Sequence, residues 1–340
     1  MKERNVSIDA IKGLAIVLVM IGHVFVHNHM EDPYVYDFIK AVQMPLFFII
    51  SGYLCGQGRK IADAKSYGKV LRKRGIAYLV PFFAWLTIKH LDNLVGAYKR
   101  IFFELDFGLW FLAVLFILTF MVYTAQLIAG ILRKNNDLFY EILFWGTYGI
   151  LCLIPVVQIV MGSTFLSPYL VVLYIPFYMM GYVCGNYGKR WFCWGSKEKG
   201  KIDCKANPAI KGMVIVCAAA FLYLVFTRNL NSMESRMETI TQMIASVLGC
   251  VAIIYGMFAL KDGKIKNIFA KIGNYTLELY VIHYHFANML NFNNRQYDFY
   301  TPQGFLFVVV SFIAMSAVTF CIIWLMKKVK ILDFFFFGKN

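Results

Sequence analysis

Long apolar stretches separated by short polar connections run through the whole chain. A stretch of about 20 apolar residues is long enough to cross a hydrocarbon layer roughly 30 Å thick. Ten such stretches are found, at residues 6–28, 38–57, 75–95, 108–130, 138–160, 168–187, 209–227, 239–260, 271–290 and 303–326. The alternating pattern of a membrane β-barrel is absent. We therefore predict an all-α polytopic membrane protein, a bundle of about ten transmembrane helices forming one integral membrane domain over residues 1–340.

The composition agrees with this pattern. The chain is 60% hydrophobic and 16% charged, which is too apolar for an ordinary soluble domain. The opening MKERNVSIDAIKG carries several charges, and no small-residue cleavage site follows the first apolar stretch. We expect that stretch to be a retained transmembrane helix and not a signal peptide.

Lysine and arginine are distributed unevenly between the connections. With the N-terminus inside, 25 of the 34 basic residues fall on the inner side and 5 on the outer side, and 4 lie within spans. Cytoplasmic connections carry such an excess, so we predict a multi-pass protein of the cell membrane with both termini cytoplasmic. The net charge of +15 is then a topology signal, and we expect no nucleic-acid partner.

Three ionisable residues lie within the first predicted helix. At 100° per residue, Lys12 and His23 differ by about 20° in direction and Asp9 lies about 40° from His23, so all three share one face. His23 is about 16 Å further along the helix than Lys12, in the outer half of the bilayer. Asp9 and Lys12 also have the i,i+3 spacing of a surface ion pair. The depth of His23 favours a functional role, because a polar group in a bilayer is costly.

Two more histidines, His27 and His29, follow at the predicted helix exit. His27 is four residues after His23, a spacing at which two helical histidines can bind one metal ion or haem. A closed site needs further ligands, and His283 and His285 would diverge by about 200° on a helix. We therefore predict no metal site and interpret His27 and His29 as residues of the membrane interface.

A basic cluster stands at the cytoplasmic end of the third span. It consists of Lys69, Arg72, Lys73 and Arg74 in the stretch KVLRKRG. Topology alone predicts basic residues there, but arginine also grips phosphate with paired donors, so the cluster suits a phosphate-rich nucleotide.

Other candidate positions are more ambiguous. Ser51 lies in FFIISGY, where small residues let helices approach closely. Trp110 stands where tryptophan often anchors a helix at the interface. Glu278 is an intramembrane carboxylate in span nine, which is functional by default although its partner can be structural. Glu278 and His285 are seven positions apart and share a helical face, whereas His283 points elsewhere.

Together these stretches resemble the membrane acyltransferase-3 family. The resemblance rests on a basic residue, ten others and then His (Lys12 to His23), and on FFIISGY, KVLRKR, LWFL and YVIH in that order. It covers residues 9–112 and 273–283, and the ten-span plan matches throughout. Two departures are Lys at position 12, where Arg is commonest, and HYH where a proline often follows the span-nine histidine.

The resemblance implies an acyltransferase of the O-acetyltransferase type. The acyl donor would be cytosolic acetyl-CoA, with its phosphates near Lys69, Arg72, Lys73 and Arg74, and the acceptor a hydroxyl of a cell-envelope or exported polysaccharide or its sugar precursor. His23 would be the general base, or the carrier of an acyl-histidine relay. Asp9 and Lys12 would orient the channel, and Ser51, Trp110, Glu278 and His283 would contact the acceptor. The lipid bilayer and other polysaccharide-biosynthesis proteins are the expected partners.

Two other classes of function remain open from the sequence. A transporter could use the same polar face to export a polysaccharide or a lipid-linked sugar without acyl transfer. A membrane redox protein could hold haem or metal through His23 and His27.

Overall fold

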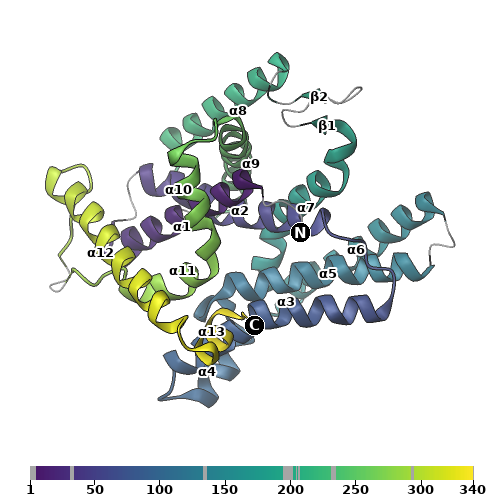
Figure 1. Cartoon of the computed structure of the whole chain (residues 1–340), viewed down its shortest axis with the longest axis horizontal. Helices are drawn as coiled ribbons and strands as arrows, with labels where there is room; N and C mark the ends of the chain where they lie inside the picture. The colour runs from purple at the N-terminus through teal and green to yellow at the C-terminus, as the bar shows by residue number, and fades with distance from the viewer. Residues whose placement is uncertain are drawn as a thin grey trace. The chain divides into compact units, whose positions relative to one another are not determined.

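The computed structural model describes residues 5–30, 34–132, 136–193, 202–203, 205, 207–230, 235–291 and 295–339. Its α-helices are α1 (Val6–His27), α2 (Tyr34–Gly56), α3 (Ala64–Lys89), α4 (Leu94–Ile101), α5 (Trp110–Leu132), α6 (Asp137–Val160), α7 (Pro168–Trp191), α8 (Pro208–Thr227), α9 (Arg236–Ala259), α10 (Lys264–Ile272), α11 (Thr276–Ile282), α12 (Pro302–Met326) and α13 (Lys330–Phe337) (Figure 1). Three 3₁₀ turns are η1 (Leu105–Phe107), η2 (Gly273–Tyr275) and η3 (His283–Phe286). Two short parallel strands, β1 (Phe192–Cys193) and β2 (Ile202–Asp203), pair Phe192 with Ile202 and Cys193 with Asp203.

Within the described residues, eight helices are long and apolar enough to cross a membrane: α1, α2, α5, α6, α7, α8, α9 and α12. The predicted all-α polytopic membrane fold is therefore confirmed. The number of spans and the side of each terminus remain predictions, because the other two predicted spans are not helices of this kind.

Those two segments differ from their predictions for different reasons. The span expected at 75–95 is the second half of α3, which begins at Ala64 with a basic first half and ends at Lys89. The span expected at 271–290 is broken into α10, η2, α11 and η3. Its sequence mixes glycine, asparagine, threonine and glutamate with apolar residues, which weakens a continuous apolar helix.

The chain divides into two compact units. Unit 1 comprises Met1–Ile50 and Asn186–Leu325, and unit 2 comprises Ser51–Gly185 and Met326–Asn340. The divisions fall inside α2 and α7 and before the last residue of α12, and each unit has its own packing.

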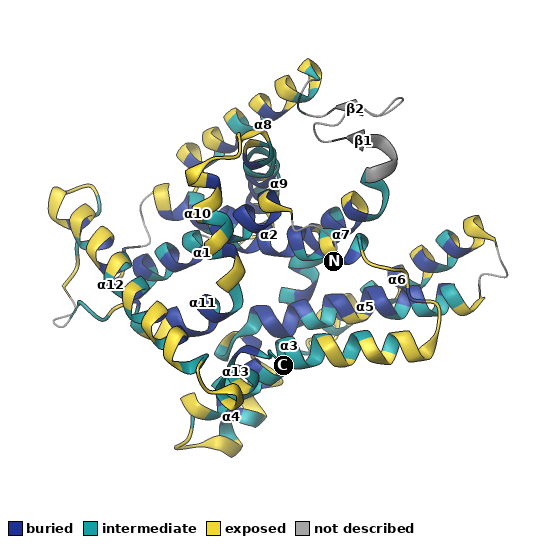
Figure 2. Cartoon of the chain, in the orientation of Figure 1, coloured by how far each residue is buried: buried dark blue, intermediate teal, exposed yellow. Residues whose placement is uncertain are grey.

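In unit 1, α1 is largely buried and packs against α10, η2 and α11 (Figure 2). Two glycines allow this close approach. A methyl group on Gly13 would overlap the carbonyl of Phe269, and one on Gly273 would overlap the carbonyl of Asp9. The backbones of α1 and the α10–η2 segment are therefore in direct contact, as in other membrane helices that cross at small residues.

In unit 2, α5 packs against both α3 and α6, and α13 packs on α3. The indole of Trp85 donates to the carbonyl of Phe336 at 3.3 Å, which joins α3 to α13. A methyl group on Gly52 would overlap the carbonyl of Tyr178, so the small residue next to Ser51 does allow close helix packing.

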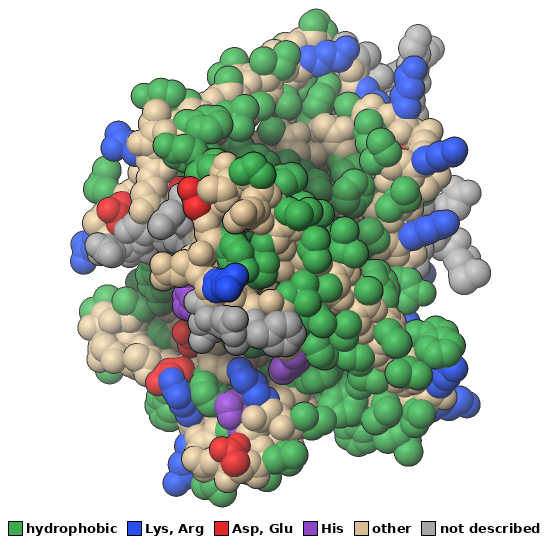
Figure 3. Space-filling view, turned by 90° about the vertical axis from the view of Figure 1, so that its left-hand side faces the viewer, with side chains coloured by type: hydrophobic (Ala, Val, Ile, Leu, Met, Phe, Trp, Pro, Cys, Tyr) green, Lys and Arg blue, Asp and Glu red, His purple; other side chains and the backbone are tan. Residues whose placement is uncertain are grey.

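Large apolar side chains remain exposed on several helices. On α8, Ile215, Val216 and Phe226 are 60–68% exposed, and on α12 Ile313 and Trp324 are both 60% exposed. Apolar side chains gather over the face drawn in Figure 3. Surfaces of this kind are expected where a helix faces lipid.

Candidate active site

His23 of α1 stands in a group of rings at the end of that helix. Its ring centroid lies 5.0 Å from that of His283, 5.3 Å from Tyr284 and 5.7 Å from His27. The ring of Tyr284 also lies 4.5 Å from that of His27, nearly perpendicular to it. The first helix and the η3 turn, about 260 residues apart in sequence, thus bring four polar rings together.

His283 is fully buried and its orientation is fixed by the backbone. Its Nδ1 lies 2.6 Å from the carbonyl oxygen of Leu279, one turn earlier. A carbonyl only accepts hydrogen bonds, so Nδ1 carries the proton and donates it. Nε2 is therefore the unprotonated nitrogen of a neutral ring, and it is buried too.

Asn28 connects the two segments that carry these histidines. It caps α1 and is fully buried, and its side-chain amide donates to the carbonyls of Val24 at 2.7 Å and Ala287 at 3.1 Å. The second bond fixes the chain just after η3. A hydrogen bond, in addition to packing, therefore holds the segments of His23 and His283 at a fixed distance from each other.

Gln43 of α2 is a polar neighbour that the sequence interpretation did not single out. A methyl group on Gly22 would come within 2.8 Å of its Oε1, and that oxygen is buried. The signal available in the sequence was a glutamine inside the predicted span 38–57. It places an amide beside the turn of α1 that carries His23.

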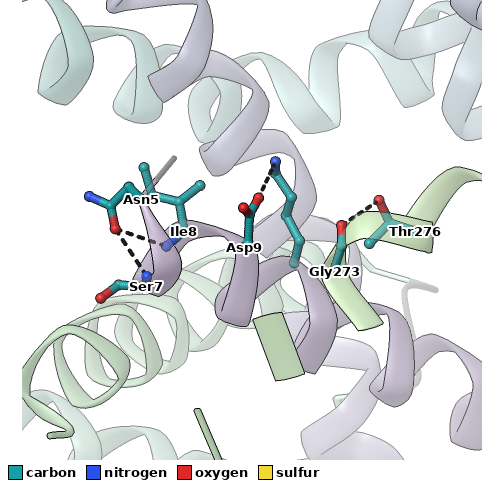
Figure 4. A network of polar contacts seen from close by, with 7 residues as sticks. Asn5, Ser7, Ile8, Asp9, Gly273 and Thr276 are labelled. Atoms are coloured by element: carbon teal, nitrogen blue, oxygen red, sulfur yellow. Dashed lines mark hydrogen bonds and ion pairs between the residues drawn. The ribbon is translucent and has the colours of Figure 1, made fainter. Parts of the chain in front are cut away.

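Asp9 and Lys12 form the ion pair that their spacing predicts. Lys12 Nζ donates to Asp9 Oδ1 at 3.2 Å, and their side chains are 22% and 9% exposed (Figure 4). Asn5 caps the same end of α1 by accepting from the amides of Ser7 and Ile8. The pair lies about 16 Å along the helix from His23, so Lys12 is not in contact with that imidazole.

The basic cluster is divided by the geometry of α3. Lys69, Arg72 and Lys73 are exposed, whereas Arg74 turns inward. Its guanidinium donates to the hydroxyl of Tyr78 at 3.1 Å, and the hydroxyls of Tyr123 and Tyr178 lie close to it. Residues two apart on a helix diverge by about 200°, which is why Arg72 and Arg74 point to opposite sides.

A buried polar network surrounds Arg74 in unit 2. The thiol of Cys55 lies near the hydroxyls of Tyr123 and Tyr178, and the hydroxyl of Tyr178 pairs with that of Thr119 at 3.1 Å. The groups around Arg74 are hydroxyls and a thiol, and no carboxylate is among the partners found for it in the described part of the chain. The sequence interpretation missed this network because its residues come from four different helices.

The sequence as a whole matches a known protein family. A model of the acyltransferase-3 family, described as an acyltransferase domain, matches residues 5–327, which is nearly the whole chain. The chain belongs to this family. As a member of it, the protein is an integral membrane protein, in agreement with the eight apolar helices.

One curated relative matches a smaller part. Nodulation protein NolL of Sinorhizobium fredii is 28% identical over 92 residues, which are 25% of this chain and 24% of NolL. The match thus spans about a quarter of the length of that relative. No solved structure matches the chain.

The remaining residues of the acyltransferase-3 motifs occupy distinct environments. Ser51 is half-buried in unit 2, where Trp110 stacks on Tyr174 with centroids 5.3 Å apart. In unit 1 Glu278 is 1% exposed, whereas His285 is exposed. The two side chains thus lie in different surroundings, and α11 ends at Ile282, before His285.

The histidines of this acyltransferase-3 chain are not arranged as a metal centre. Within the ranges that the structure describes, no group of three or more His, Cys, Asp or Glu residues could hold a metal ion. His29 is exposed at the exit of α1, with a φ of 56°. The role of His29 at the membrane interface stays a prediction.

Proposed function

We propose that this protein is an acyl-CoA-dependent membrane acyltransferase that transfers an acetyl group to a hydroxyl of a cell-envelope or exported polysaccharide or its sugar precursor. Family membership supports acyl transfer, and the grouping of His23 with His283 at the end of α1 is the observation that carries the proposal. An imidazole with near-neutral pKa in ordinary surroundings is suited to remove a proton from a hydroxyl.

In the proposed reaction His23 acts as the general base. Its nitrogen takes the proton of the acceptor hydroxyl while the hydroxyl oxygen attacks the thioester carbonyl. The carbon–sulfur bond then breaks, the acyl group stays on the acceptor oxygen, and the leaving thiolate takes the proton from the imidazolium. Atoms and charge therefore balance without a metal ion.

The donor is proposed to bind through its phosphates to the basic residues of unit 2. Arg74 supports this most directly, because a half-buried guanidinium among hydroxyls is costly without an anionic partner. Phosphate oxygens would accept from the guanidinium and from neighbouring tyrosine hydroxyls. The exposed Lys69, Arg72 and Lys73 would attract the polyanion electrostatically.

The other motif residues are given supporting roles in this proposal. Asp9 and Lys12 hold the channel open toward the donor arm, because their ion pair places two polar groups on the face of α1 that carries His23. Glu278 in unit 1, and Ser51 and Trp110 in unit 2, are each proposed as acceptor contacts, whereas His283, which is fully buried, is not given this role. Each of these roles is tested by substitution in the same assay.

The test is transfer of labelled acetyl from acetyl-CoA to acceptor by the full-length protein in lipid nanodiscs. His23→Ala should reduce the rate by about 10²- to 10⁴-fold, the usual contribution of a general base. His29→Ala is the matched control, because His29 is exposed on the same segment. A His23→Ala protein that is folded and fully active would refute the proposal.

The donor site is tested separately. Arg74→Met should raise KM for acetyl-CoA by about tenfold or more, because a charge-assisted contact to phosphate is lost. Arg59→Met, an exposed arginine of the same unit, should leave KM unchanged. Movement of a sugar substrate without acetyl-CoA consumption would instead identify a transporter.

A further inference from the structure

The nitrogen of His283 that faces away from its own helix has no partner in the structure. Nδ1 donates to the Leu279 carbonyl, which leaves Nε2 as a buried acceptor without a hydrogen bond among the described residues. Burying an acceptor without a donor costs free energy, so a donor is expected to meet it at some stage of the reaction.

His23 offers the nearest suitable donor. Its Nδ1 is also buried without a hydrogen-bond partner in the described part of the chain. An N–H···N bond of about 2.9 Å between two imidazoles places their centroids roughly 5 Å apart. The observed separation is 5.0 Å, which suits such a bond when the His23 ring turns its Nδ1 toward His283 Nε2.

The other rings of the group are less suited to this position. The ring of Tyr280 is 6.4 Å from that of His283, farther than the ring of His23. The ring of Tyr284 lies nearly perpendicular to that of His23, at 5.3 Å.

We propose that His283 is a positioning residue for His23. In this inference, which rests on the proposed function, His23 Nδ1–H donates to His283 Nε2. That bond fixes the His23 tautomer in which Nε2 is unprotonated, so Nε2 is the atom that takes the acceptor's proton. His283 remains neutral throughout, and the proton passes from the hydroxyl to His23 Nε2 and then to the leaving thiolate.

A neutral partner is consistent with the location of the pair. A carboxylate in this position would stabilise the imidazolium more strongly but would add a charge in a membrane-embedded site. An imidazole whose Nδ1 proton is held by a backbone carbonyl supplies an acceptor of fixed direction without that charge.

Two substitutions separate positioning from a purely structural role. Asn places its amide near the Nδ1 position and keeps the bond to Leu279, whereas Gln reaches the Nε2 position and supplies an acceptor to His23. If the inference holds, kcat of His283→Asn falls by about tenfold or more below that of His283→Gln, with KM for acetyl-CoA unchanged. His285→Asn and His285→Gln are the matched controls, because His285 is exposed two residues later. A structural role alone would give the opposite order, and that result would overturn the inference.

A spectroscopic measurement covers the case in which both variants fold poorly. The chain has only six histidines, so ¹⁵N-histidine labelling in lipid bilayers, with His23→Gln for assignment, resolves the His23 ring. The inference predicts the Nδ1–H tautomer in the wild-type protein, and the Nε2–H tautomer would contradict it. If His23→Ala is fully active, the proposed function fails; if His23→Ala is inactive but His23 is the Nε2–H tautomer, only this inference fails.

Discussion

At the level of single residues, the pair of Asp9 and Lys12 has a direct energetic consequence. Lys12→Met removes the ammonium that pairs with the buried Asp9 carboxylate at 3.2 Å, so we expect a loss of about 1 kcal/mol in the free energy of unfolding. Lys12→Arg keeps the charge and should cost less. Thermal unfolding in nanodiscs measures both, and equal melting temperatures for Lys12→Met and wild type would contradict the expectation.

Asp63 gives the protein a local dependence on pH. It caps α3, and hydrogen bonds from the Ser66 amide at 2.8 Å and from the Ser66 hydroxyl at 2.7 Å lower the pKa of its carboxyl below the usual value. A lowered folded pKa means that the cap stabilises the helix above about pH 4 and is lost as the pH falls through the folded pKa.

Hydrogen exchange in the first turn of α3 checks this. Protection of the Ser66 and Tyr67 amides, corrected for intrinsic rates, should be constant above about pH 4 and should fall as the pH is lowered from there through the folded pKa of Asp63. Asp63→Asn keeps a capping oxygen but does not titrate, so its protection should be independent of pH. The same decrease in both proteins would show that another group is responsible.

Residue spacing predicted side-chain contacts correctly within a regular helix. The i,i+3 spacing of Asp9 and Lys12 predicted their ion pair, which is present. The contact between His23 and His283 was missed, because spacing within residues 271–290 does not report which of its residues pack against α1. Gln43 and the hydroxyls around Arg74 were missed, because they reach these positions through packing between different helices. Spacing along one helix does not report such packing.

Among the elements, the crossing of α1 and the α10–η2 segment depends on Gly13 and Gly273. Because an added methyl group would overlap a backbone carbonyl, Gly13→Ala should lower the free energy of unfolding by about 1–3 kcal/mol. Acyl transfer should fall too, since α11 and η3 carry Glu278 and His283.

Gly149→Ala in α6 is the matched control for this crossing. A methyl group there meets no atom within 4 Å, so alanine should be neutral or stabilising through its helix propensity. Thermal unfolding of the two variants gives the comparison. Equal behaviour of Gly13→Ala and Gly149→Ala would contradict the packing derived for α1.

Apolar length predicted most elements well, and it failed where polar and apolar residues mix. The eight candidate spans coincide with eight of the ten predicted stretches. In α3 the basic first half is continuous with the apolar second half, because a helix does not end where hydropathy changes. In 271–290 the turns depend on local backbone geometry, which hydropathy does not report.

For the whole molecule, the open question is the number of crossings. The eight helices, α3 and the broken segment together make ten, which would place both termini in the cytoplasm; nine would place them on opposite sides. The bias of basic residues favours ten.

Labelling of single cysteines in intact cells tests this count, in a chain whose native cysteines have been replaced. A membrane-impermeant maleimide should reach Thr164→Cys and Tyr297→Cys from outside, and should reach Lys264→Cys only after permeabilisation. Tyr297 reports on the broken segment, because it follows that segment directly. Protection of Tyr297→Cys together with labelling of Thr164→Cys would mean that 271–290 does not cross.

The bond from Asn28 to the carbonyl of Ala287 has a consequence for how sequences of this kind are classified. Asn28 lies five residues after His23 and belongs to none of the motifs Lys12 to His23, FFIISGY, KVLRKR, LWFL and YVIH. A chain with Lys12, His23 and the span-nine histidine intact, but with a leucine at position 28, would be counted as an active enzyme by its motifs. Its two histidines would nevertheless lose the bond that fixes one segment against the other, and its turnover would be low.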